Sequence, residues 1–174
     1  MACMGFGQSH DDGFAALCGA ASLCDGCEMP GNTAFDEAVA NLVGTAVTNE
    51  ETLELARTLQ GMSDDERAKL LSREAKRLGT TCALGDIYQV RAKAFRAHQV
   101  ARLCALGATC DTFDAVDPAS VVTCAEATLA PEFSGELARM NLTSPASLAQ
   151  NLEQFARKHT TAGCALVTVL REAQ

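Results

Sequence analysis

Apolar residues recur every three or four positions along most of the chain, which is the spacing of helices that bury one face. In the segment 63–78, Ala68, Leu71, Ala75 and Leu78 keep this period. Aromatic residues make up only 5% of the chain and Trp is absent, whereas strands prefer aromatic and β-branched side chains. The pattern therefore predicts an all-α fold.

Residues typical of helix ends divide this pattern into separate helices. Ser63-Asp64-Asp65-Glu66 matches a capping box, in which the serine oxygen accepts a hydrogen bond from a first-turn amide and the glutamate reaches back to the cap amide. Gly79 is placed to end that helix. Asp117-Pro118 combines a cap with a proline at the first helical position. Further expected caps or helix starts are Thr33, Asn49 and Ser144.

The stretch Leu84–Cys110 predicts the longest helix, with residues 84–106 as its helical part. Its wide apolar face indicates contact with two neighbouring bundles, and we expect Phe95 and Ala101 to be buried. The residues assigned to this face are Ile87, Val90, Ala94, Ala97, Ala101 and Cys104, widened by Tyr88, Phe95 and Leu103. The basic residues at its edges are expected to meet an acidic neighbour, from this chain or another: Arg91, Lys93, Arg96 and Arg102.

Several short patterns occur twice, in the same order. Leu17–Cys24 has the sequence LCGAASLC and Leu103–Cys110 has LCALGATC, while ELAR occurs at Glu54–Arg57 and at Glu136–Arg139. Repetition at a nearly fixed spacing indicates duplicated structural units. We predict two tandem four-helix units that share the long helix. The expected division is a flexible tail over residues 1–10, a first unit over 11–83 and a second over 84–174.

The charge is acidic overall and unevenly distributed. A formal net charge of -8 argues against nucleic acid as a partner, because phosphates need a basic surface. Residues 1–62 contain nine acidic residues and one basic residue, whereas residues 63–110 contain nine basic and five acidic ones. The favoured interpretation is that the basic middle packs near the acidic ends. The alternative is head-to-tail association with an acidic partner.

The nine cysteines are more than a reduced cytosolic protein usually contains, and they favour an oxidising compartment. No stretch is apolar enough to cross a membrane, and the sequence before Phe14 has no signal-peptide pattern. Either the protein stays inside the cell or a targeting segment has been removed. The cysteine content favours the second, and we expect a periplasmic, cell-surface or secreted protein.

Matched cysteines in matched units are expected to pair alike. The favoured long-range bonds are Cys24–Cys82 and Cys110–Cys164, which leave Cys18 for Cys27 and Cys104 for Cys124. The matched alternative is Cys18–Cys82 with Cys104–Cys164, and sequence alone does not choose between them. Cys3 has no counterpart. It is a free thiol, a crosslink to another chain, or a lipid acceptor if a signal segment once preceded it.

Metal binding competes with disulfide formation. Cys24 and Cys27 form a CxxC pair with Met29 two residues further on, a soft donor set that suits Cu(I). With Cys18 and Cys82, the same region offers four thiolates for zinc or an iron–sulfur cluster. A structural zinc site usually has two such pairs, so this lone CxxC is a weak signal.

No set of residues predicts catalysis. The three histidines are scattered, and no pair of acids is singled out by its spacing. Two hypotheses follow. The first is a non-enzymatic, extracytoplasmic, disulfide-bonded helical module that binds a protein partner or serves as a subunit of an assembly. The second is a copper- or zinc-binding or trafficking protein that uses Cys24, Cys27 and Met29 with Cys18 or Cys82.

Overall fold

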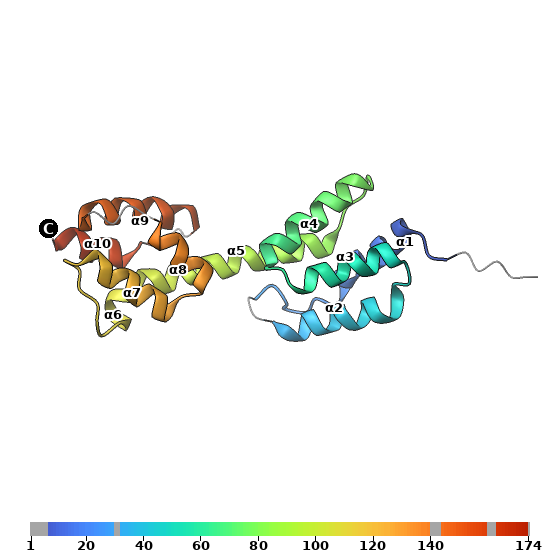
Figure 1. Ribbon diagram of the computed structural model, residues 1–174, viewed down its shortest axis with the longest axis horizontal. Coiled ribbons are helices and arrows are strands. Elements are labelled where there is room, and N and C mark those ends of the chain that lie inside the picture. The colour runs from blue at the N-terminus through green and yellow to red at the C-terminus, as the bar shows by residue number, and fades with distance from the viewer. Residues whose placement is uncertain (1–6, 30–31, 140–143, 160–162, 174) are drawn as a thin grey trace, which may run out of the picture. The chain divides into compact units, whose positions relative to one another are not determined.

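The computed structural model describes residues 7–29, 32–139, 144–159 and 163–173 of the 174-residue chain (Figure 1). Within these ranges it contains α-helices, one short 3-10 helix and no strand, so the all-α prediction is confirmed. The α-helices are α1 (His10–Gly19), α2 (Thr33–Ala46), α3 (Glu50–Gln60), α4 (Asp64–Arg77), α5 (Ala83–Cys104), α6 (Leu106–Thr109), α7 (Pro118–Thr128), α8 (Pro131–Ala138), α9 (Pro145–His159) and α10 (Ala165–Glu172), and the 3-10 helix is η1 (Ala20–Leu23).

The chain divides into two compact units, Met1–Phe95 (unit 1) and Arg96–Gln174 (unit 2). Helix α5 passes through this division, so its residues up to Phe95 belong to unit 1 and the rest to unit 2. Each unit has a buried apolar cluster of its own. The division lies twelve residues beyond the predicted end of the first unit at residue 83.

The helix ends are formed largely by the residues that the sequence marks. Ser63 and Glu66 make both hydrogen bonds of the capping box, and Gly79 has the left-handed φ of 66°. The amide of Thr80 donates to the carbonyl of Ala75 at 2.9 Å, which completes a Schellman motif at the end of α4. Asp117 caps α7 with proline at its start. Helix α2 is capped by Asn32, so the expected cap at Thr33 is wrong by one residue.

In unit 1, α1 packs against α2 and α3, and α4 approaches α5 closely at Gly85. A Cβ at Gly85 would lie 3.3 Å from the Leu71 side chain, so the small residue permits this approach. The most deeply buried large side chains of the unit 1 core are Phe14, Leu17, Leu71 and Leu84.

In unit 2, α10 packs against α9 and α6, and α7 packs against α8 and α6. The buried Gln99 accepts a hydrogen bond from the amide of Ala130 at 3.1 Å, just before α8 begins. This bond satisfies an amide that the helix itself leaves unpaired. The most deeply buried large side chains of the unit 2 core are Leu103, Leu106, Leu148, Leu152, Leu166, Leu170 and Val100.

The buried face of α5 differs from the prediction. Val90 and Ala101 are exposed, and Phe95 is half-buried. Leu103 and Cys104 are buried as predicted. In unit 1 the helix buries the predicted Tyr88 together with Arg91, which is expected at an edge of this face. Valine and alanine offer less apolar area than tyrosine, and the Arg91 cation is drawn inward by acidic partners, so these two side chains decide which face is covered.

The chain is already held in place from Gln8, inside the segment predicted to be a flexible tail. The Gln8 Oε1 atom accepts from the amide of Thr48 at 2.6 Å and from that of Asn49 at 3.2 Å. Ser9 caps α1, which begins at His10. These bonds fix the start of α1 against the start of α3.

No helix in the described part of the chain is both long enough and apolar enough to span a membrane.

Candidate functional site

Four disulfides connect the eight cysteines of the described residues. Two bonds are long-range: Cys18–Cys82 spans 64 residues in unit 1, and Cys104–Cys164 spans 60 residues in unit 2. Their Cα atoms lie 4.9 and 4.8 Å apart, within the usual range for a disulfide. The favoured pairing of Cys24 with Cys82 and of Cys110 with Cys164 is therefore wrong, and the matched alternative describes the long-range bonds.

The local backbone explains this outcome in unit 1. Cys18 lies on the buried face of α1 and is 7% exposed, so it meets Cys82 next to the core. Cys24 follows η1 in an extended conformation and pairs with Cys27. Gly26, with φ of 64°, turns the intervening loop back, which any other residue type does less easily.

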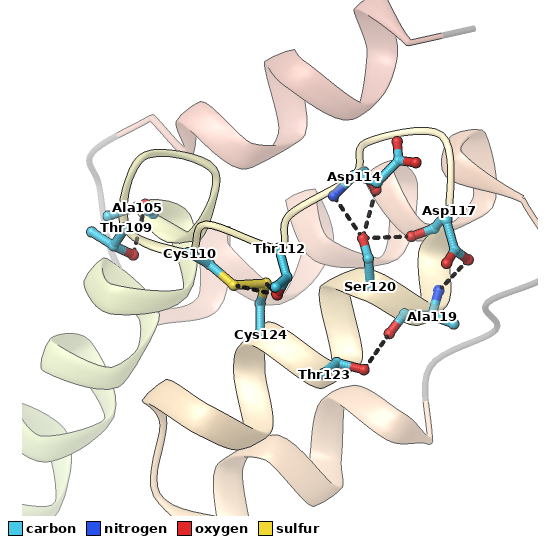
Figure 2. Close-up of a disulfide and its surroundings, with 10 residues drawn as sticks. All are labelled: Ala105, Thr109, Cys110, Thr112, Asp114, Asp117, Ala119, Ser120, Thr123 and Cys124. Carbon is cyan, nitrogen blue, oxygen red and sulfur yellow. Dashed lines mark hydrogen bonds between the residues drawn. A yellow bond between two sulfur atoms is a disulfide. The ribbon is translucent and has the colours of Figure 1, made fainter.

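The corresponding short bond of unit 2 joins Cys110 to Cys124 in α7 (Figure 2). The Thr112 hydroxyl lies 3.4 Å from the Cys110 sulfur and 3.6 Å from the Cys124 sulfur. Further along the chain, the hydroxyl of Ser120 in α7 donates to the carbonyl of Asp114 and accepts from its amide. The predicted pairings Cys18–Cys27 and Cys104–Cys124 are wrong as well, because Cys18 and Cys104 form the long-range bonds and leave Cys27 and Cys124 to the short ones.

The proposed soft-metal ligands are divided between two disulfides. Cys18 and Cys82 form one, and Cys24 and Cys27 form the other, so in this oxidised form none of these sulfurs is a thiolate ligand. Met29 is 68% exposed. The sulfurs of Cys24 and Cys27 and a Glu28 carboxylate oxygen lie within 4.8 Å of one another. Cys3, considered above as a lipid acceptor, lies outside the described residues.

A second group with metal-binding atoms consists of His10, Glu51 and Glu74, whose ligand atoms lie within 4.8 Å of one another. His10 Nε2 is 2.8 Å from a Glu74 oxygen, and Nδ1 is 3.1 Å from the Thr52 hydroxyl. The Arg77 guanidinium already lies 2.6 Å from Glu74 and 3.3 Å from Glu51. This cation pairs with both carboxylates, and the group is best described as an ion-pair cluster between α1, α3 and α4.

Unit 1 contains a cleft of about 290 Å³ that lies mainly between α2 and α3. Half of its lining residues are aliphatic, and the side chains of Leu17 and Leu59 at the wall are almost fully buried. Two acidic side chains of α2, Asp36 and Glu37, also line it. The residues lining the cleft are Leu17, Thr33, Asp36, Glu37, Val39, Ala40, Val43, Ala56, Leu59, Gln60, Arg67 and Tyr88.

A network of four charged residues adjoins this cleft. Arg91, only 3% exposed, donates from both terminal nitrogens to Asp36 at 2.8 and 3.4 Å, and its Nε lies 3.0 Å from an Asp64 oxygen. Arg67 lies 3.3 Å from Asp36 and 3.4 Å from Asp64. The Arg91 Nε–Asp64 contact is an ion pair without hydrogen-bond geometry. Arg67 and Arg91 thus each pair with both Asp36 and Asp64.

Aromatic rings cover the two cations. The guanidinium carbons of Arg67 and Arg91 lie 5.1 and 5.6 Å from the centre of the Tyr88 ring, and Arg91 is 5.8 Å from that of Phe35, within cation–π range. Burial opposes the Arg91 charge, but the hydrogen bond to Asp36 and the charge of Asp64 outweigh it and raise the pKa of Arg91. Burial also raises the pKa of the Tyr88 phenol. The Arg91 charge is therefore maintained beside the cleft, whereas burial raises the pKa of the Asp64 carboxyl.

The basic residues predicted to form an interaction edge on α5 lie in different environments. Arg91 is inside unit 1, within the network just described. Lys93, Arg96 and Arg102 are exposed, with Lys93 in unit 1 and the other two in unit 2.

The sequence predicts an acidic neighbour for Arg91, but it indicates neither the cleft nor which acids form the network. Asp64 is predicted only as part of the capping box at Ser63, and both Asp36 and Asp64 lie in helix first turns. The available signal was the presence of Arg91 among apolar residues of a long helix, since such a cation needs an acidic partner from another element.

Comparison of the chain with protein-family models, curated proteins and solved structures finds no match.

Proposed function

We propose that the protein is a non-enzymatic helical module that acts outside the cytoplasm and binds a protein partner. The observation that carries this proposal is the pairing of all eight described cysteines in disulfides, two in each unit. Stable disulfides are typical of oxidising compartments. They also stiffen the units, and a stiff surface loses less entropy on binding.

The two units are, in this proposal, copies of one ancestral unit. Cys18 and Cys104 each pair with the cysteine that precedes the last helix of their unit, Cys82 and Cys164. Cys24 and Cys110 each follow a short helix and pair with the next cysteine along the chain. Two units with the same order of bonds are more simply explained by duplication than by separate origin.

Protein binding is favoured over catalysis by the character of the cleft. Half of its lining residues are aliphatic, and the Asp36 and Arg67 side chains in its wall are already held in ion pairs. Such groups orient a partner and exclude wrong ones by charge, whereas an acid–base catalyst needs a group that is available to the substrate.

Mass spectrometry of the protein from its own cells, alkylated before any reduction, tests the compartment and the disulfides. We expect eight cysteines to escape alkylation and the chain to be eight hydrogens lighter than its reduced form. Photo-crosslinking in those cells, from exposed positions on both units, tests protein binding. A reduced, alkylated chain or the lack of any protein crosslink would overturn the corresponding part of the proposal.

A second candidate function is soft-metal binding, which the proximity of Cys24, Cys27 and Glu28 favours. In a reduced chain, these two thiolates and the exposed Met29 thioether would suit Cu(I), and a second pair from Cys18 and Cys82 would suit zinc. The same mass measurement under native conditions separates the two functions. Free thiols together with bound copper or zinc would favour metal binding over the disulfide-bonded module.

A further inference from the structure

We infer that the cleft between α2 and α3 receives apolar side chains from a basic, helical segment of a partner protein. The inference rests on the proposed protein-binding function and specifies its site and the chemistry of the partner. It draws on three features of the described residues: the size and lining of the cleft, the openness of its mouth, and the charge of the two helices that border it.

The cleft has room for apolar side chains. A cavity of about 150 Å³ lined by aliphatic side chains holds one benzene ring, and this cleft, at about 290 Å³, is roughly twice that size. The chain leaves it open because small residues, Ala40 in α2 and Ala56 in α3, face it. Covering the half-buried Val43 and the exposed Ala40 removes apolar area from water, which favours binding.

The cleft is open to solvent along one side rather than enclosed. A small-molecule site usually buries most of the ligand surface, which an open cleft at the small end of the usual size range does poorly. A partner helix does not need to be enclosed. It inserts one or two side chains and covers the mouth with its own backbone and neighbouring residues, as helix-in-groove complexes do.

The charge around the cleft specifies a basic partner. Residues 33–60, which include α2 and α3, contain five acidic residues and one basic residue, Arg57. Arg57 already lies 3.0 Å from Glu54 and 3.5 Å from Glu50. Arg67, the cation in the cleft wall, is paired with Asp36 and Asp64. Glu37 is exposed at the cleft, where a lysine or arginine of the partner would meet it.

The test uses a defined probe, a fluorescent amphipathic helical peptide of leucine and lysine, about 18 residues long so that a helix can form. Its binding to the full-length oxidised protein is measured by fluorescence anisotropy. Two matched peptides serve as comparisons, one with glutamate in place of lysine and one with alanine in place of leucine. We expect only the leucine–lysine peptide to bind, with binding that weakens as salt is raised.

Two variants locate the site. Ala40→Phe fills the mouth of the cleft, and we expect it to weaken binding about tenfold, the loss of a central anchor contact. Glu37→Lys inverts the charge at the rim, and we expect about threefold weaker binding, mostly through slower association. The matched controls are Ala127→Phe and Glu126→Lys, which make the same changes at exposed positions of α7 in unit 2. These controls should bind like the unaltered protein.

The controls also separate the inference from simple attraction between a cationic peptide and an acidic protein. Equal losses for Glu37→Lys and Glu126→Lys, or unchanged binding by Ala40→Phe, would overturn the inference. Tight binding of the glutamate peptide would overturn its charge component, and sedimentation showing self-association through the cleft would replace the partner with a second copy. If crosslinking in cells identifies a partner elsewhere on the surface, the inference fails while the proposed function stands.

Discussion

At the scale of single residues, Gly13 controls how closely α1 approaches α3. A Cβ placed on Gly13 would lie 2.6 Å from the Thr52 hydroxyl oxygen and 3.1 Å from the Thr52 Cβ. Thr52 is fully buried and holds the hydroxyl contact with the His10 ring. Because threonine is branched at Cβ, it has little freedom to move aside. The glycine is therefore needed for the contact between the two helices.

Substitution of Gly13 by alanine tests this contact. We expect Gly13→Ala to lower the free energy of unfolding by about 1–3 kcal/mol, the usual range for an overpacked site. Gly19→Ala is the matched control in the same helix, because its added Cβ has no neighbour within 4 Å, and it should be neutral or slightly stabilising. Urea unfolding of both variants measures the difference. An equal effect at the two positions would contradict the role of Thr52.

Arg91 is a second residue whose contacts contribute to the stability of unit 1. It has two carboxylate partners, Asp36 and Asp64, and its charge is covered by the Tyr88 ring. Removal of one member of a buried ion pair leaves the others without a counter-charge in a poorly solvated place. The loss therefore extends beyond the contacts of Arg91 itself.

Replacement of Arg91 by methionine keeps most of the side-chain volume and removes the charge. We expect Arg91→Met to destabilise the protein by about 3 kcal/mol, because two carboxylates are then left with Arg67 alone. Lys93→Met, an exposed position on the same helix, should change stability by less than about 0.5 kcal/mol. Chemical denaturation with both variants provides the comparison. Similar values would mean that the network contributes little net stability.

The sequence predicts residues whose role is local better than residues whose role depends on distant partners. The capping box at Ser63 and the left-handed Gly79 are confirmed, because both act within one turn of the chain. The acidic neighbour expected for Arg91 is present, but its expected place at an edge of the apolar face is wrong, because its burial depends on Asp36 and Asp64, which come from two other helices. No local pattern distinguishes those two acids from others in helix first turns.

At the scale of elements, one ion-pair cluster ties α1 and α3 to α4. Glu74 of α4 accepts from Arg77 at 2.6 Å and contacts His10 of α1 at 2.8 Å. The Arg77 hydrogen bond is the main cause of a Glu74 pKa below its ordinary value of 4.5, and the His10 contact adds to it. The ionised carboxylate is therefore favoured in the folded protein.

This lowered pKa makes part of the stability depend on pH. The carboxylate contributes fully above pH 4.5, and the contribution is lost as the pH falls through the lower folded-state pKa. We expect Glu74→Gln to cost at most about 1 kcal/mol at neutral pH. The difference in stability between Glu74→Gln and the unaltered protein should shrink as the pH falls through the folded-state pKa of Glu74. Thermal unfolding of both proteins from pH 7 to pH 3 tests this, and a constant difference would rule out Glu74 as the titrating group.

The elements themselves were predicted more successfully than the way in which they pack. Most helix locations followed from periodicity and caps, but the covered face of α5 did not, because alanine is frequent on several sides of this helix. Val90 and Ala101 are exposed as a result. The cysteine pairing shows the same limit. Cys18 and Cys24 are six residues apart, and only the direction taken by η1 decides which of them meets Cys82.

At the scale of the whole molecule, each unit combines its own apolar core with one long-range and one short-range disulfide. A crosslink stabilises mainly by restricting the unfolded chain, so its effect grows with the length of the loop that it closes. Cys18–Cys82 closes a far longer loop than Cys24–Cys27. The two bonds of unit 1 should therefore contribute unequally.

Removal of each bond in turn measures this difference. Replacing Cys18 and Cys82 by alanine should lower the free energy of unfolding by about 4 kcal/mol, and replacing Cys24 and Cys27 should lower it by about 2 kcal/mol. The loss should fall on unit 1, because the unit 2 core has its own bond. Hydrogen exchange locates it: amides of Leu71 and Ala75 in the unit 1 core should exchange faster, and those of Leu152 and Ala156 in unit 2 should not. Equal acceleration in both units would show that the chain unfolds as a single cooperative body, with the disulfides acting on all of it.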